Sequence, residues 1–267
     1  MKYNLGALPN KEDKRDILLG RISPKVQIPE SYITNSSLIK TLYQDKYPMC
    51  GSHAGSLFKA WHDIIETGTT QNYSPVYLWK KIKAIDGYAP EMGTDMRSIF
   101  KVLSNTGVCD YNLLPTDYTL SLEEQTKDNT NEEQNENAHP RIIKSYAQDS
   151  GDIQFLKEQI YLHKLAIVLA NVGNTWWGKK EVVPFTKMDG GHFFVAYGYD
   201  KDGVFVVDSA DKDVPFKHIS NDYVIRAVGT AVDLPNWQVT VMKKHIFILK
   251  QIVELLIKLK KQYEQRT

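Results

Sequence analysis

The segment YQDKYPMCGSHAGSLFKAW (residues 43–61) decides how this chain is interpreted, because it places Gln44 six residues before Cys50 at the start of a helical pattern. A helix N-terminus stabilises a thiolate through its unpaired N–H groups and its macrodipole. The side chain of Gln44 and the backbone N–H of Cys50 are suited to bind a developing oxyanion. The segment therefore predicts acyl transfer, with Cys50 as nucleophile and Gln44 as oxyanion donor.

A base and a group to orient it are predicted downstream, in MDGGHFFVAYGYDKDGVFVVDSAD (residues 188–211). His192 opens a β-rich run after two glycines, and Asp208 ends the next run. We assign His192 as general base and Asp208 as the group that orients its imidazole. Aspartates at strand ends also commonly serve turns, so this second assignment depends on the whole constellation.

Together these segments resemble the papain-like cysteine peptidases, in particular their short prokaryotic and phage members. The spacing from Gln44 to Cys50 equals the family's own, residues 74–116 are similar to its helical region, and GGHFFVAYGYD (residues 190–200) is similar to its histidine strand. The resemblance implies an α+β fold with a helical lobe, an antiparallel β lobe and an active-site cleft between them. It also implies a polypeptide substrate and a site without metal or other cofactor.

The chain departs from the family pattern at two places. Gly51 stands where a tryptophan usually follows the nucleophile, and Asp208-Ser209-Ala210-Asp211 replaces the usual Asn-Ser-Trp-Gly. An aspartate accepts a hydrogen bond from an imidazole and favours its charged form, so a Cys-His-Asp site is chemically sound. Both features are also similar to the bacteriocin-processing peptidases, which are the nearest alternative.

Hydrophobic periodicity predicts helices first and strands second, as an α+β protein requires. We expect a papain-like peptidase domain over residues 1–240, interrupted by an acidic loop or insertion at about 121–139. Thr94 is the expected N-cap of the third helix. The expected helices cover residues 50–67, 74–85, 94–106 and 152–163, and the expected strands 141–148, 165–172, 192–200, 203–210 and 223–232.

The C-terminal stretch, residues 241–267, has apolar residues at three- and four-residue intervals, which predicts an added amphipathic helix. Lys250, Glu254 and Lys258 interrupt its apolar run too early for a membrane span of about 20 residues. Three roles remain open: packing on its own domain, self-association or attachment to a larger assembly, and lying on an anionic membrane surface.

Composition narrows the partners and the compartment. A net charge of +1 gives no general attraction to nucleic acid. The two cysteines, Cys50 and Cys109, are too few for a disulfide framework, which favours a reducing compartment. No apolar run of signal-peptide length begins the chain, so we expect a cytoplasmic or virion-associated protein, without a long inhibitory segment ahead of Gln44.

Several residues near the motif have simpler interpretations. His53 is expected to be structural, and a metal site of Cys50, His53 and His62 lacks an evident fourth ligand. Trp176 and Trp177 are expected to be cleft-wall or surface aromatics. Two alternatives to a peptidase remain: a non-catalytic papain-like scaffold, for example in a phage particle, and a cell-wall peptide hydrolase or transpeptidase.

Overall fold

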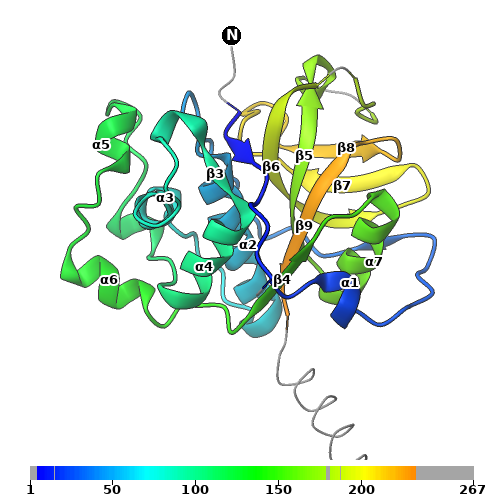
Figure 1. Cartoon of the computed structure of the whole chain (residues 1–267), viewed down its shortest axis with the longest axis horizontal. Helices are drawn as coiled ribbons and strands as arrows, with labels where there is room; N and C mark the ends of the chain where they lie inside the picture. Colours follow the sequence, from blue (N-terminus) through cyan, green and yellow to red (C-terminus); the bar gives the residue numbers. More distant parts are fainter. Residues whose placement is uncertain (1–4, 15, 179–180, 187, 233–267) are drawn as a thin grey trace, which may run out of the picture. The chain divides into compact units, whose positions relative to one another are not determined.

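The computed structural model describes residues 5–14, 16–178, 181–186 and 188–232 (Figure 1). The amphipathic helix predicted over residues 241–267 lies outside these residues, as does the end of the domain predicted over 1–240. Among the described residues no helix is both long enough and apolar enough to cross a bilayer.

Three helices make the centre of the helical lobe, and each has a sequence signal at one of its ends. Helix α2 (Cys50–Thr67) ends at Gly68, whose φ of 73° is the left-handed conformation that glycine adopts without strain. Helix α3 (Pro75–Lys83) is capped by Ser74. Helix α4 (Met96–Asn105) is capped by Asp95, whose side chain accepts from the backbone N–H of Ser98, so the expected cap at Thr94 was wrong by one residue.

The acidic segment at residues 121–139 is not a loop. It folds into α5 (Leu122–Thr126) and α6 (Glu132–Ala138), and both helices begin with a capping box in which the cap and the third residue bond each other's backbone N–H. Polar composition hid these helices, because neither has an apolar stripe along one face. Short 3-10 helices, η1 (Pro90–Met92) and η2 (Tyr111–Leu113), complete the helical lobe.

The β lobe is an antiparallel sheet, as expected. Within the described residues it has seven strands, with β4-β9-β5-β6-β7-β8 in order and β2 paired to β6. Strand β8 was not anticipated from the sequence. The helix α7 (Ile153–His163), predicted at 152–163, lies against β6 and β9. The strands are β2 (Tyr32–Ile33), β4 (Tyr146–Asp149), β5 (Ala166–Gly173), β6 (Met188–Tyr199), β7 (Gly203–Val207), β8 (Phe216–Ser220) and β9 (Ile225–Ala231).

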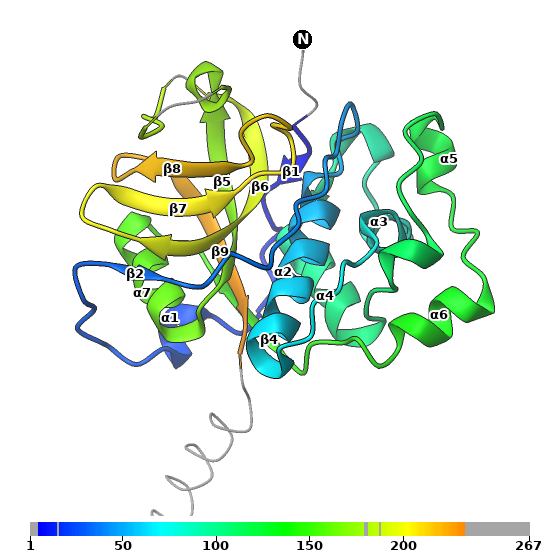
Figure 2. The same cartoon turned by 180° about the vertical axis from the view of Figure 1, so that it is seen from behind.

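Helix α2 joins the two lobes, because it packs on α3 and α4 on one side and on β6 on the other (Figure 2). Glycine permits this close approach at Gly51, where a Cβ atom would lie 2.6 Å from Thr94 Cγ2 and 3.3 Å from Phe193 Cδ2. The tryptophan that usually follows the nucleophile therefore has no room here. Cys50 and Phe193 belong to one buried hydrophobic cluster, so the start of α2 is fixed by the core.

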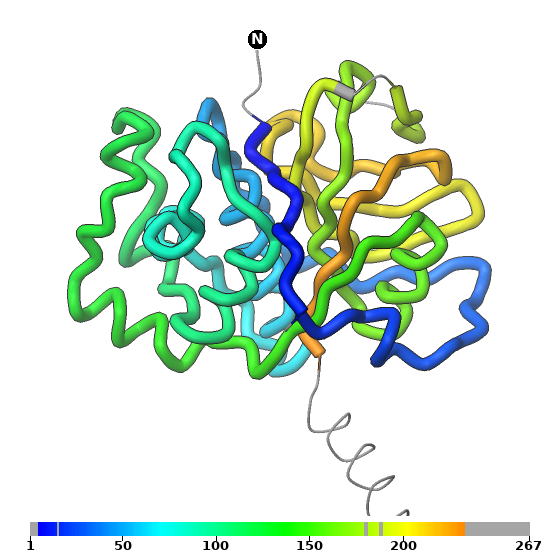
Figure 3. The backbone as a smooth tube through the Cα atoms, viewed as in Figure 1, coloured from blue at the N-terminus to red at the C-terminus, as the bar shows by residue number. Residues whose placement is uncertain are grey.

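The N-terminal residues 5–14, called the strap below, run across the junction of the two lobes (Figure 3). Strand β1 (Ala7–Leu8) pairs in parallel with β3 (Thr94–Asp95) just before α4. Beyond the strap, the chain forms the one-turn helix α1 (Leu19–Ile22) beside β4. The N-terminal segment is thus bonded to both lobes, to β3 through β1 and to Gln148 on β4 through Asn10 and Ile17.

Candidate active site

Cys50 is the first residue of α2 and is completely buried. The N-cap residue Met49 makes no side-chain cap, so the thiol stands at a helix N-terminus without a competing acceptor from that residue. The loop that precedes it is tied to the β lobe, because the backbone N–H of Gln44 donates to the carbonyl of Ser209 over 2.8 Å. The predicted nucleophile is therefore held between the two lobes.

The structure brings His192 and Asp208 together, as the sequence predicted. Asp208 directly follows β7, and the antiparallel pairing of β6 with β7 places it near His192 on β6. His192 Nε2 lies 2.7 Å from Asp208 Oδ1, and both side chains are fully buried. The other ring nitrogen, Nδ1, makes no hydrogen bond within the usual limits among the described residues, but the Cys50 thiol acts on the ring electrostatically.

The electrostatics of the pair favour an imidazolium and a carboxylate. Burial by itself would lower the pKa of His192, but the charge and hydrogen bond of Asp208, with a smaller effect of Cys50, raise it to about 10. Burial would likewise raise the pKa of Asp208, but His192, the N–H of Ala210 and the charge of Lys217 hold that pKa below its ordinary value. The site is thus built to keep the ion pair charged near neutral pH.

Gln44 is also buried, and two hydrogen bonds fix its side chain. Its Oε1 accepts from Ser209 Oγ over 2.7 Å, and its Nε2 donates to the carbonyl of Tyr47 over 3.0 Å. An amide nitrogen carries two hydrogens, so the bond to Tyr47 leaves one for another acceptor. This geometry is compatible with the oxyanion role assigned to Gln44.

His53 is buried one turn after Cys50, in the structural position expected of it. Its Nδ1 lies 3.0 Å from the carbonyl of Met49. Burial lowers the pKa of His53 to about 4, against the opposing effect of that carbonyl, so the ring is neutral near pH 7. Farther along α2, the side chains of His62, Asp63 and Glu66 offer possible metal-binding atoms within 4.8 Å of one another. This group does not include Cys50 or His53.

Trp176 is the site residue that sequence reasoning missed. It ends the short helix η3 (Asn174–Trp176) after β5 and is fully buried, not a surface aromatic. Its indole Nε1–H donates to Asp208 Oδ2 over 2.7 Å, and its ring meets that of His192 edge-on. Nothing in the local sequence distinguishes it from Trp177, which is partly exposed.

The strap lies over the candidate site, against the residues that precede Cys50 and His192 in the chain. A Cβ atom on Gly6 would lie 2.2 Å from the carbonyl oxygen of Pro48, and one on Gly191 would lie 2.5 Å from the carbonyl oxygen of Ala7. The backbone N–H of Thr94 also donates to the carbonyl of Gly6 over 2.9 Å. The strap therefore lies against residues just before Cys50 and just before His192, in a structure where both side chains are buried.

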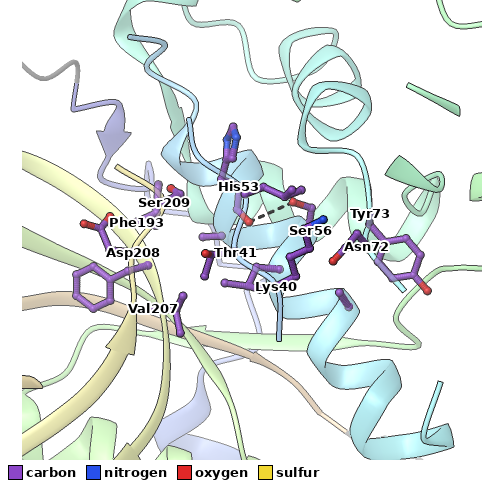
Figure 4. Close-up of a pocket in the computed structure, with 15 residues that line it drawn as sticks. Lys40, Thr41, His53, Ser56, Asn72, Tyr73, Phe193, Val207, Asp208 and Ser209 are labelled. Carbon is purple, nitrogen blue, oxygen red and sulfur yellow. Dashed lines mark hydrogen bonds between the residues drawn. The ribbon is translucent and has the colours of Figure 1, made fainter. Parts of the chain in front are cut away.

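A small cavity adjoins the candidate site (Figure 4). Its lining includes His53 on α2, Phe193 on β6, and Asp208 and Ser209 after β7. Its volume of about 20 Å³ is enough for a water molecule but not for a peptide side chain.

Comparison with solved structures identifies the fold. No family model matches the chain, and no curated protein matches it. Among solved structures it is similar to xylellain, a cysteine protease from Xylella fastidiosa, with a TM-score of 0.72 and 17% identity over 87% of this chain and 97% of that one. It is also similar to procathepsin B S9 from Trypanosoma congolense, with a TM-score of 0.66 and 11% identity over 86% of each chain.

A third similar structure is the bromelain protease from Ananas comosus in complex with the E64 inhibitor, with a TM-score of 0.58 and 14% identity over 75% of this chain and 98% of that one. The described part of the chain has the papain-like fold, and the expected helical and antiparallel β lobes are confirmed. Identities this low show the fold and not the activity.

Proposed function

We propose that the chain is a cysteine-type peptidase in which the Cys50 thiolate attacks a peptide carbonyl carbon and forms an acyl-enzyme. The C–N bond breaks as the His192 imidazolium gives its proton to the leaving amine. The neutral imidazole then takes a proton from water, whose oxygen attacks the thioester carbon; the C–S bond breaks, the acid leaves, and the Cys50 thiolate and the His192 imidazolium are regenerated. The backbone N–H of Cys50 and the second N–H of Gln44 stabilise the oxyanion in both steps.

One observation carries this proposal: the buried His192 ring is hydrogen-bonded to Asp208 over 2.7 Å and also interacts electrostatically with the thiol of Cys50. All three side chains are buried. A buried ion pair of this kind is expensive unless its groups are satisfied, and perturbed groups cluster at functional sites. An amine in place of water would accept the acyl group by the same route, so a transpeptidase acting on wall peptides belongs to the same chemistry.

The burial of Cys50 beneath the strap favours a second candidate, a papain-like scaffold without activity. The two functions differ in the reactivity of the thiol. Alkylation of Cys50 by an epoxide reagent at pH 7, followed by mass spectrometry, tests this directly. Peptidase function requires that Cys50 react and that His192→Ala slow it strongly.

Cys109 provides an internal reference for this test. It is buried, and burial, followed by the charge of Asp110, raises its pKa to about 12. Its thiolate fraction at pH 7 is on the order of 10⁻⁵. Equal rates of labelling at the two cysteines would favour the scaffold. The same labelling rate of Cys50 in the parent and in His192→Ala would also favour it.

A further inference from the structure

Trp176 makes the contact that fixes the second oxygen of the Asp208 carboxylate. Asp208 Oδ1 accepts from the backbone N–H of Ala210 over 2.8 Å and lies 2.7 Å from His192 Nε2. Its Oδ2 accepts from Trp176 Nε1–H over 2.7 Å. An indole N–H is a donor only, so it bonds an ionised carboxylate oxygen and cannot accept from a protonated one.

The Trp176 ring is itself held by neighbours on several sides. It stacks on Phe194 with centroids 5.1 Å apart and meets Tyr223 at 5.8 Å. The ammonium of Lys217 lies 5.5 Å from its centroid, and Lys217, which is almost fully buried, pairs with Asp211 over 2.7 Å. A cation over an indole face is attracted to the ring, so the indole has one defined orientation.

The position of the ring also affects the ion pair. The edge-on contact of Trp176 with His192, with centroids 5.7 Å apart and planes at 75°, covers the His192–Asp208 bond with apolar surface. Removing water from a charged hydrogen bond strengthens it, because the local dielectric constant falls. Trp176 therefore acts on the imidazole by two routes, one through the carboxylate and one by excluding water.

We propose that Trp176 is a positioning residue of the His192–Asp208 pair: its N–H fixes the carboxylate so that Oδ1 alone faces the imidazole. This inference rests on the proposed function, since it concerns the base of that reaction. Trp176 transfers no proton itself and acts on the base through Asp208 and by excluding water.

The test compares Trp176→Phe with the matched variant Trp177→Phe in the full chain. Phenylalanine keeps apolar cover and removes the N–H. The readout is the pH dependence of the second-order rate of Cys50 alkylation. We expect Trp176→Phe to lower this rate at pH 7 about ten- to hundredfold, the usual effect of losing a bond to a charged group, and to move the alkaline limb of the profile to lower pH. Trp177→Phe should leave the profile unchanged.

The outcomes separate the two proposals. If His192→Ala slows Cys50 but Trp176→Phe has the parent's profile, the role of Trp176 is wrong and the peptidase function stands. If His192→Ala has no effect on Cys50, the function fails and the role of Trp176 fails with it.

A second measurement covers the case in which Trp176→Phe does not fold. The indole N–H proton resonance of Trp176 is recorded in the parent and in Asp208→Asn, with that of Trp177 as reference. We expect a strongly downfield signal in the parent that moves upfield in Asp208→Asn. The same signal position in both chains would overturn the inference.

Discussion

Replacing Arg97 with glutamine is expected to loosen the strap and to speed the reaction of Cys50 with alkylating reagents. Arg97 Nε donates to Asp16 Oδ1 over 2.8 Å, and its Nη2 donates to Asp16 Oδ2 and to the carbonyl of Lys11. The Arg97 and Asp16 side chains are only 12% and 15% exposed, so solvent screens their bond weakly. Arg97→Gln removes this fastening while the backbone N–H of residue 97 still donates to Asn10 Oδ1.

The size of the effect follows from the kind of bond that is lost. A hydrogen bond to a charged group contributes about 1.5 to 3 kcal/mol, and every 1.4 kcal/mol is a tenfold change in an equilibrium. Cys50 has no exposed surface beneath the strap, so the reagent reacts with the open state. The observed rate is proportional to the open fraction while that fraction is small, and we expect about a ten- to hundredfold increase.

The assay is the second-order rate of Cys50 alkylation at pH 7, read by peptide mass spectrometry. Arg226→Gln, which removes an exposed arginine on β9, is the matched control and should leave the rate unchanged. Thermal unfolding checks that both variants fold. The reasoning is refuted if folded Arg97→Gln reacts at the parent's rate, or if Arg97→Gln speeds Cys50 equally in a chain lacking residues 1–14.

Three further predictions concern single positions. Asp208→Asn should keep hydrolysis within about tenfold of the parent, because an amide oxygen still accepts from the imidazole, whereas Asp208→Ala should lose about ten- to hundredfold more; equal rates for Ala and parent would reduce the site to a Cys50–His192 dyad. Folding lowers the pKa of His53 to about 4. Between pH 6.5 and 4 the unfolded chain therefore binds a proton at His53 that the folded chain does not bind. The free energy of unfolding should fall by up to about 3 kcal/mol as the pH falls through this range. Urea unfolding at pH 7 and 4.5 should show a smaller drop for His53→Gln, and the same drop in both chains would contradict this. Gly51→Ala should cost about 1 to 3 kcal/mol of unfolding free energy by overpacking against Thr94, despite alanine's better helix propensity; unchanged stability by the same method would show that the core relaxes.

Much of the fold could be predicted because its signals are local. The apolar stripe of α2 and the β-branched runs of β5, β6, β7 and β9 are periodic patterns that any window of the sequence contains. The acidic helices α5 and α6 lack such a stripe, and only their capping residues, Ser121 with Glu124 and Asn131 with Gln134, indicated them. A capping box in a polar segment is weak in isolation, since the same residues also favour turns.

The residues of the candidate site could be proposed for a related reason: a nucleophile, a base and an oxyanion donor are recognised by residue type and by short spacing, and these roles stay predictions. The groups that hold them could not be proposed in this way. Trp176 reaches Asp208 because β5 pairs with β6 in the register that sets Ala170 opposite His192, which brings the residues after β5 to the end of the sheet where His192 lies. The strap reaches the same place through the pairing of Ala7 with Thr94, 87 positions apart in the chain. Both contacts depend on a register between distant segments, and a shift of one residue would turn the side chains involved to the opposite face. The residues that tune and cover this site are therefore fixed by strand pairing, which no single stretch of the sequence contains.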